Sequence, residues 1–232
     1  MAGISIFTSI GLILTTLITL WLFFKASHHK RALYGILIWM GIAGVLGATG
    51  FYQKLGTFPP RFILLLPPSI LFVLLLFTNK KSKKFIDSLS LKHLTILHIV
   101  RIPVEITLYY IFLSGLIPDL MTFDGYNFDI LSGITAPIMY YLVFVKKTMG
   151  RKGLLIWNII CLGLLINILV IAVLSAQTPF QQLAFDQPNI GVTYFPFVWL
   201  PAVIVPIVLF SHLASIRQLI HRKKAADIAY KQ

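Results

Sequence analysis

Seven long apolar runs, separated by short polar segments, dominate the chain. They cover residues 4–24, 32–52, 61–77, 91–116, 130–145, 154–174 and 195–219. A helix needs about 20 largely apolar residues to cross a bilayer, so the pattern predicts an all-α fold. We expect a polytopic transmembrane helical bundle of about seven helices, forming a single transmembrane domain over residues 1–232. Pro67 and Pro68 in the short third run leave open whether that run crosses fully or dips in and returns.

The basic residues fall between the apolar runs, and their distribution predicts the orientation. If all seven runs cross, one side of the membrane carries Lys25, Lys30, Arg31, Lys80, Lys81, Lys83, Lys84, Lys146, Lys147, Arg151, Lys152, Arg217, Arg222, Lys223 and Lys224. The other side keeps only Lys54 and Arg61 as cations, beside Asp119, Asp124, Asp129 and Asp186. Because cytoplasmic loops are enriched in Lys and Arg, we expect the N-terminus outside and the C-terminus in the cytoplasm of a multi-pass cell-membrane protein.

Composition agrees with a membrane setting and excludes several kinds of site. The chain is 58% hydrophobic and 12% charged, whereas soluble domains are about 25% charged. The net charge of +13 sits in topology-determining loops and not in a soluble basic domain, so the lipid bilayer is expected as a partner and nucleic acid is not. The single cysteine, Cys161, rules out intrachain disulfides and multi-thiolate metal sites. No cofactor and no metal site is expected.

A polar stripe in the fourth run is the first candidate site. At 100° per residue, His98, Arg101, Glu105 and Tyr109 fall on one face of a helix. A lone charge at mid-membrane costs from about 3 to more than 10 kcal/mol, so Arg101 and Glu105 are expected to pair or to face a wet cavity. Arg before Glu is the poorer order for such a pair, which leaves room for another partner. The stripe predicts a site for an ion, a proton or a polar ligand, and a salt bridge that only fixes packing is the alternative.

The loop after this run supplies further candidates: Asp124, Asn127 and Asp129. Asp124 precedes a glycine and predicts a turn, while Asp129 is placed to cap the fifth helix. These oxygen-bearing side chains suit a cation, although their spacing does not match an EF-hand. A turn followed by a helix cap is the simpler interpretation. Further along, Thr178 before Pro179 predicts a short interfacial helix reaching Asp186.

Other polar and small residues inside the runs receive mainly structural interpretations. Four glycines at every third position, Gly41, Gly44, Gly47 and Gly50, predict close helix packing or a gating hinge. Asn158 and Asn167 lie on opposite faces, so each is expected to bond a neighbouring helix separately. His93, His98 and His212 are expected to be separated in depth or face, which disfavours a zinc hydrolase. The last run also lacks the lysine that a rhodopsin needs for its Schiff base.

Two segments resemble an uncharacterised bacterial family of small seven-helix membrane proteins. They are HIVRIPVE and MTFDGYNFDILSGITAP, within residues 98–137. The resemblance implies a bacterial inner membrane and draws attention to the polar residues of those segments, namely Arg101, Glu105, Asp124, Asn127 and Asp129. It implies no activity.

The leading functional hypothesis is a small transporter or ligand-sensing protein. Glu105 would accept a proton or cation, Arg101 would hold an anion or carboxylate, and His98 would be a titratable neighbour. A small polar ligand, a proton or a cation is therefore the expected partner. One alternative is a membrane-embedded enzyme for lipid-like substrates with Glu105 and His98 as acid and base. The other is a structural or assembly subunit whose charged stripe binds another membrane protein.

Overall fold

The computed structural model describes residues 4–54 and 59–229, with side chains in the last helix described as far as residue 221. The basic side chains of Arg222, Lys223 and Lys224 therefore lie outside the described ones. Within this part of the chain the protein is all-α and has no strand. The α-helices are α1 (Ile6–Ser27), α2 (Lys30–Ala48), α3 (Pro67–Leu76), α4 (Lys80–Ser88), α5 (Leu91–Leu97), α6 (Arg101–Leu113), α7 (Ile130–Tyr140), α8 (Arg151–Leu174) and α9 (Val205–Ala229).

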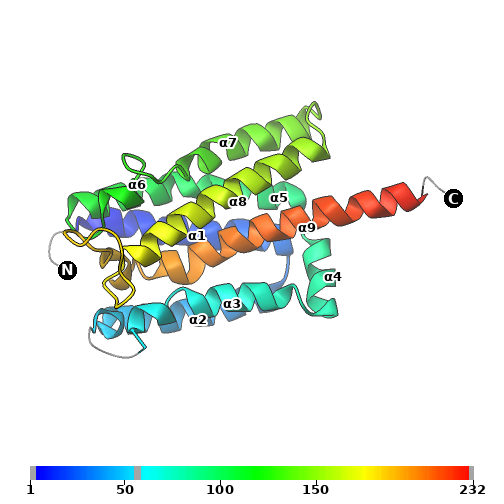
Figure 1. Ribbon diagram of the computed structural model, residues 1–232. Coiled ribbons are helices and arrows are strands. Elements are labelled where there is room, and N and C mark those ends of the chain that lie inside the picture. Colours follow the sequence, from blue (N-terminus) through cyan, green and yellow to red (C-terminus); the bar gives the residue numbers. More distant parts are fainter. Residues whose placement is uncertain (1–3, 55–58, 230–232) are drawn as a thin grey trace.

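Shorter turns of helix join or extend these elements. The 3₁₀ turns are η1 (Phe51–Gln53), η2 (Arg61–Leu64), η3 (His98–Val100), η4 (Asp119–Met121) and η6 (Gly191–Thr193), and the π-helical segments are η5 (Tyr141–Val145) and η7 (Leu200–Ile204). The long helices run roughly along one axis, α2 and α3 lie along one side, and α4 stands crosswise near one end (Figure 1). α1 begins at the opposite end of the bundle from the end of α9.

Among the described residues, five helices are long and apolar enough to cross a membrane. They are Ile6–Ser27, Lys30–Ala48, Leu91–Leu113, Arg151–Leu174 and Leu200–His221. A sixth is obtained if Arg61–Leu76 and Lys80–Ser88, bent by 91° where they meet, form one span. Ile130–Val145 is also apolar but shorter. The all-α prediction is confirmed, and the seven-span count and the orientation stay predictions.

The third apolar run does not form one helix. Pro67 and Pro68 stand in the first turn of α3, where a missing N–H removes no helical hydrogen bond. The run is thus divided between η2 and α3, and α3 then turns sharply into the lysine-rich α4. The prolines mark a helix start here instead of a kink within a helix.

The fourth run is interrupted at the depth of the polar stripe. η3 separates α5 from α6, and Pro103 lies just after this break. Proline has no N–H, and its ring crowds the carbonyl four residues earlier, here that of Ile99, which lies in the 3₁₀ turn η3. The segment from α5 to α6 packs against α1, α7 and α9. The polar side chains at the break are therefore enclosed by other helices.

Two of the four regularly spaced glycines provide close helix packing. A Cβ on Gly47 would lie 2.7 Å from Cγ1 of Val198, and one on Gly44 would lie 3.1 Å from the indole nitrogen of Trp199. Gly41 has no such neighbour among the described atoms. The missing side chain of a glycine also lets α7 lie close to α6, since a Cβ on Gly133 would lie only 2.8 Å from Cγ1 of Ile102. This second approach sets the position of the loop before α7.

Interhelical hydrogen bonds gather the basic segments at one end of the bundle. The main-chain N–H of Ser90 donates to the carbonyl of Ala26, next to Lys25. Arg217 pairs with Asp87 of α4 at 2.8 Å, and Arg151 donates to the carbonyl of Leu219 at 2.8 Å. The starts of α5 and α8 and the ends of α1 and α9 consequently share this end.

The predicted interfacial helix after Thr178 is absent, so that prediction was wrong. Residues 175–190 form turns, and an isolated bridge joins Ala176 to Asn189. The amides of Gln182 and Leu183 both bond back to the carbonyl of Leu174, and Ala184 has a φ of 55°. Because these amides point back to α8 and the backbone leaves the right-handed region, a helix cannot continue.

Candidate functional site

Arg101 is the centre of a buried polar cluster, and its partner is Asp129. Arg101 is 2% exposed, and its guanidinium forms an ion pair with the Asp129 carboxylate through Nη1. Of the alternatives left open by the sequence, Arg101 therefore does not pair with Glu105, and the other partner for which there was room is Asp129. Asp129 comes within reach because Gly133, one helical turn further along, allows α7 to lie directly against Arg101 and Ile102. The poorer Arg-before-Glu order along one helix gives way to this interhelical pair.

Asp129 stands at the predicted N-cap position of α7, but its side chain does not make a cap hydrogen bond there. Instead, its Oδ1 accepts from Arg101 and, more weakly at 3.4 Å, from the hydroxyl of Ser132. The carboxylate therefore faces the bundle interior, where it neutralises a charge that would otherwise be buried alone.

Asn127 links the carboxyl group of Glu105 to the main chain of Asp129. Its Nδ2 donates to Oε2 of Glu105 at 2.6 Å and to the carbonyl of Met121 at 3.0 Å. Its Oδ1 accepts from the main-chain N–H of Asp129 at 3.1 Å. Glu105 itself is 1% exposed and has no ion-pair partner within the described part of the chain. One amide from the loop thus fixes Glu105 and the start of α7 together.

His98 and His212 lie against each other, although the sequence predicted them to be apart. Their rings stack with centroids 3.8 Å apart. His212 contacts Oδ1 of Asn158 through Nδ1 at 2.9 Å and Nη2 of Arg101 through Nε2 at 3.2 Å. The amide of Asn158 is oriented by its own donation to the carbonyl of Leu154, so its Oδ1 accepts. His212 therefore carries its proton on Nδ1 and accepts the arginine N–H on Nε2.

His98 differs from its neighbour in having no hydrogen bond. It is fully buried, and neither ring nitrogen has a partner among the described residues. Its other ring contact is with Trp157, edge on at 5.6 Å. His98 thus packs as a buried aromatic ring between Trp157 of α8 and His212 of α9.

The structure separates two of the predicted site residues from this cluster. Tyr109 stacks on Phe123 at 4.9 Å, and Asp124 is exposed on the loop. The other five, His98, Arg101, Glu105, Asn127 and Asp129, lie together. Sequence reasoning missed Asn158, Ser132 and the main-chain carbonyl of Cys161, which accepts from Arg101 at 3.4 Å, as well as the role of His212. The signal available for Asn158 and His212 was their polarity within apolar runs.

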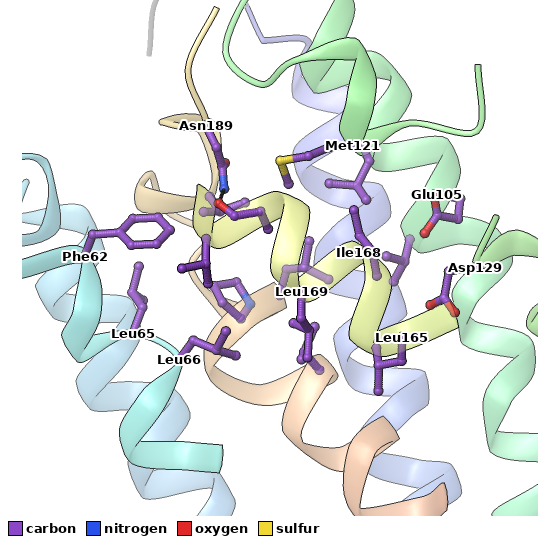
Figure 2. A pocket seen from close by; sticks show the side chains of 18 residues that line it. Phe62, Leu65, Leu66, Glu105, Met121, Asp129, Leu165, Ile168, Leu169 and Asn189 are labelled. Carbon is purple, nitrogen blue, oxygen red and sulfur yellow. Dashed lines mark hydrogen bonds between the residues drawn. The ribbon is translucent and has the colours of Figure 1, made fainter. Parts of the chain in front are cut away.

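A largely apolar cavity ends at the two carboxyl groups (Figure 2). About 70 Å³ of it admits the centre of a water-sized molecule, which is room for several waters. Its polar lining consists of Glu105, Asp129 and Asn189, and its apolar lining comes from η2, α6, α8 and the start of α9. The side chain of Asn189 is 1% exposed, and its Oδ1 has no partner in the described part of the chain. His98, Arg101 and His212 do not line this cavity.

Comparison with known proteins places the chain in a family without an assigned activity. The model of a domain of unknown function, DUF8737, matches residues 57–220, which is more than half of the chain and includes every residue of the cluster. The chain belongs to the DUF8737 family. No curated protein and no solved structure matches it.

The charge balance of this DUF8737 domain defines what the cluster can do. Two buried carboxyl groups, Glu105 and Asp129, face one buried guanidinium, Arg101. The ion pair uses the only cation among these three groups and leaves Glu105 with a neutral amide as its partner. A buried carboxylate without a cation is costly, so Glu105 is suited to hold a proton or to receive a cation from the cavity. Among the described residues, no group of three or more His, Cys, Asp or Glu is arranged to hold a metal ion.

Proposed function

We propose that this protein is an integral membrane protein that binds a small protonatable or cationic ligand at Glu105, as a transporter or a ligand sensor. The observation that carries the proposal is the position of the Glu105 carboxyl on the wall of an internal cavity, with Arg101 already paired to Asp129. In this role Glu105 accepts the proton or the cation. Arg101 holds the second carboxylate in place, which is a positioning role.

The arrangement of the helices supports a membrane setting with seven crossings. Large apolar side chains are exposed along the long helices, for example Trp21, Ile38, Phe72 and Ile160, as lipid contact requires. The basic segments share one end of the bundle, which the positive-inside rule assigns to the cytoplasm. An odd number of crossings agrees with α1 beginning at the end of the bundle opposite to the end of α9 (Figure 1). We therefore place the N-terminus outside and the C-terminus in the cytoplasm of the cell membrane.

The energetics favour a binding role for Glu105. Burying an ionised carboxylate without a cation costs free energy, both in hydrocarbon and in a protein interior. Protonation of the carboxylate or binding of a cation removes that cost. A site that exchanges a proton for a cation at one carboxyl is the simplest device for coupled transport. The same exchange would report ligand occupancy in a sensor.

An enzyme acting on lipid-like substrates is less well supported by the geometry. General acid and base groups must reach the same substrate, but Glu105 lines the cavity and His98 does not. A role purely in assembly is also disfavoured, because Arg101 finds Asp129, His212 and the Cys161 carbonyl within its own chain. The charges of Arg101 and Asp129 neutralise each other, so neither requires a partner on another protein.

A panel of cations tests the proposal. Purified protein in nanodiscs would be titrated with sodium, potassium and a series of primary alkylamines while its thermal unfolding is followed. We expect at least one compound to stabilise the wild type and Asp124→Asn, whose acid is exposed on the loop, and to leave Glu105→Gln unchanged. For a transporter, an outward gradient of that compound would move protons into proteoliposomes loaded with a pH-sensitive dye. The proposal fails if every response survives Glu105→Gln.

A further inference from the structure

The wall of the cavity identifies the kind of ligand more closely. Most of it is formed by aliphatic and aromatic side chains, including Phe62 and Leu66 beside α3, Leu108 of α6, and Leu165 and Leu169 of α8. Polar groups stand only at two places, with Glu105 and Asp129 at one and Asn189 at the other. Such a site gains most from an apolar body and uses few polar contacts for orientation.

The cavity reaches the surface between η2 and α8. Val173 of α8 lines it and is 44% exposed, whereas Leu165, two turns deeper, is 2% exposed. Phe62 on the facing side is half-buried. In the proposed membrane setting Val173, the residue before the last of α8, lies near the outer edge of the hydrocarbon layer.

Glu105 and Asn189 both offer hydrogen-bond acceptors to the cavity, so a ligand that supplies donors would suit it. Glu105 is an excess acid, and Oδ1 of Asn189 is a buried acceptor whose own amide nitrogen is already used by the carbonyl of Ala172. An unpaired buried acceptor is unfavourable. A donor on the ligand, or a water that the ligand retains, would remove that cost.

We infer that the ligand is a membrane-dissolved amphiphile, an alkyl chain with a primary ammonium head, which enters sideways between η2 and α8. Its ammonium meets Glu105 and its chain lies along Leu165 and Leu169 of α8. The Oδ1 of Asn189 receives its hydrogen bond from a water molecule that stays in the cavity beside the ligand. This inference rests on the proposed function of Glu105 and adds to it the apolar body and the lateral route.

Photolabelling tests the inference on the full chain in nanodiscs. The probe is dodecylamine with a diazirine in its alkyl chain, and labelled residues are located by mass spectrometry. We expect adducts on residues that line the cavity, and we expect unlabelled dodecylamine to compete at least about tenfold better than dodecanol, a difference of about 1.4 kcal/mol.

Two valines of α8 provide a matched pair of variants. Val173 lines the mouth, and Val170, one turn away, is 50% exposed but does not line the cavity. Val173→Trp should block the mouth and abolish cavity labelling, while Val170→Trp should leave it at the wild-type level. Because both side chains are already exposed, neither change disturbs the core.

The outcomes separate the inference from the proposed function. Labelling that persists in Val173→Trp, or equal competition by dodecanol, overturns the lateral amphiphile site. If butylamine or a metal cation then still stabilises the protein in a Glu105-dependent manner, the proposed function stands without it. If no amine or cation distinguishes Glu105→Gln from the wild type, both fail.

Discussion

Arg101 and Asp129 are 28 positions apart in the chain, yet their side chains form a buried ion pair between α6 and the start of α7. Breaking such a pair is costly because it strands one charge, typically about 3–5 kcal/mol, whereas removing both charges costs much less. We therefore expect Arg101→Ala and Asp129→Asn each to destabilise the protein by several kcal/mol, and a double variant, Arg101→Met with Asp129→Asn, to recover much of the loss.

Thermal unfolding in one detergent would measure these effects. Arg217→Ala is the control, since it breaks the more exposed pair with Asp87 and should cost no more than about 1 kcal/mol. Equal losses in the single and double variants would show that the two charges do not compensate each other.

The histidine pair gives a second prediction. His98→Phe removes two buried nitrogens that have no partner among the described residues and keeps an aromatic ring, so stability should be unchanged or slightly increased. His212→Phe instead strands Nη2 of Arg101 and Oδ1 of Asn158 and should cost about 1–3 kcal/mol for each group left unpaired. The two variants would be compared by thermal unfolding. A large loss in His98→Phe would mean that its nitrogens have partners.

A third prediction concerns Asn127. Its amide supplies hydrogen bonds to Glu105, Met121 and the backbone of Asp129. Asn127→Ala should destabilise the protein by about 1–3 kcal/mol, because a buried carboxyl group and a buried N–H lose their partners. It should also change the protonation of Glu105, which infrared difference spectroscopy can follow through the carboxyl band that disappears in Glu105→Gln. Asp124→Asn, on the same loop, should affect neither quantity.

A glycine pair tests the close contact that places Asp129. Gly133→Ala would bring a Cβ to 2.8 Å from Cγ1 of Ile102 and 3.0 Å from its main-chain nitrogen. We expect a loss of about 1–3 kcal/mol from this overpacking, together with weaker binding at Glu105. Gly163→Ala, on a helix and with no described atom within 4 Å, should be neutral or gain up to about 1 kcal/mol. Thermal unfolding of both variants checks the contrast.

Membrane orientation gives a fifth prediction. In a background in which Cys161 is replaced by alanine, Lys81→Cys on α4 should react with an impermeant maleimide only after the cells are opened. Asp124→Cys on the loop before α7 should react in intact cells. The opposite pattern would reverse the orientation, and reaction of both positions from one side would exclude an odd number of crossings between them.

Local patterns in the sequence predicted the elements, while contacts between distant elements decided the site. Apolar runs were enough to predict the long helices, because run length and hydropathy are local properties, and the stripe of His98, Arg101 and Glu105 follows from helical periodicity alone. Periodicity along one helix does not predict which residues these side chains pair with. Arg101 was expected to pair with Glu105, to face a wet cavity or to find another partner, and Gly133 lets α7 bring Asp129 to it as that partner.

The stacked histidines are a second contact that local sequence patterns did not predict. His98 and His212 lie on different helices, and their relative depth depends on where each helix begins. A shift of one turn, about 5 Å, separates a stacked pair from an unrelated one. The 3₁₀ turn at η3 and the π-helical segment η7 both change the register of the helices that carry these rings. Hydropathy alone cannot predict such local changes in pitch.

Asn127 connects the exposed loop that contains Asp124 to the buried carboxyl group of Glu105. The residue belongs to the connection that includes the exposed Asp124, and its single amide holds Glu105 while its oxygen anchors the start of α7. Any rearrangement of that connection must release both contacts in the same movement. A change in this exposed connection would thus reach the buried carboxyl group of Glu105 directly.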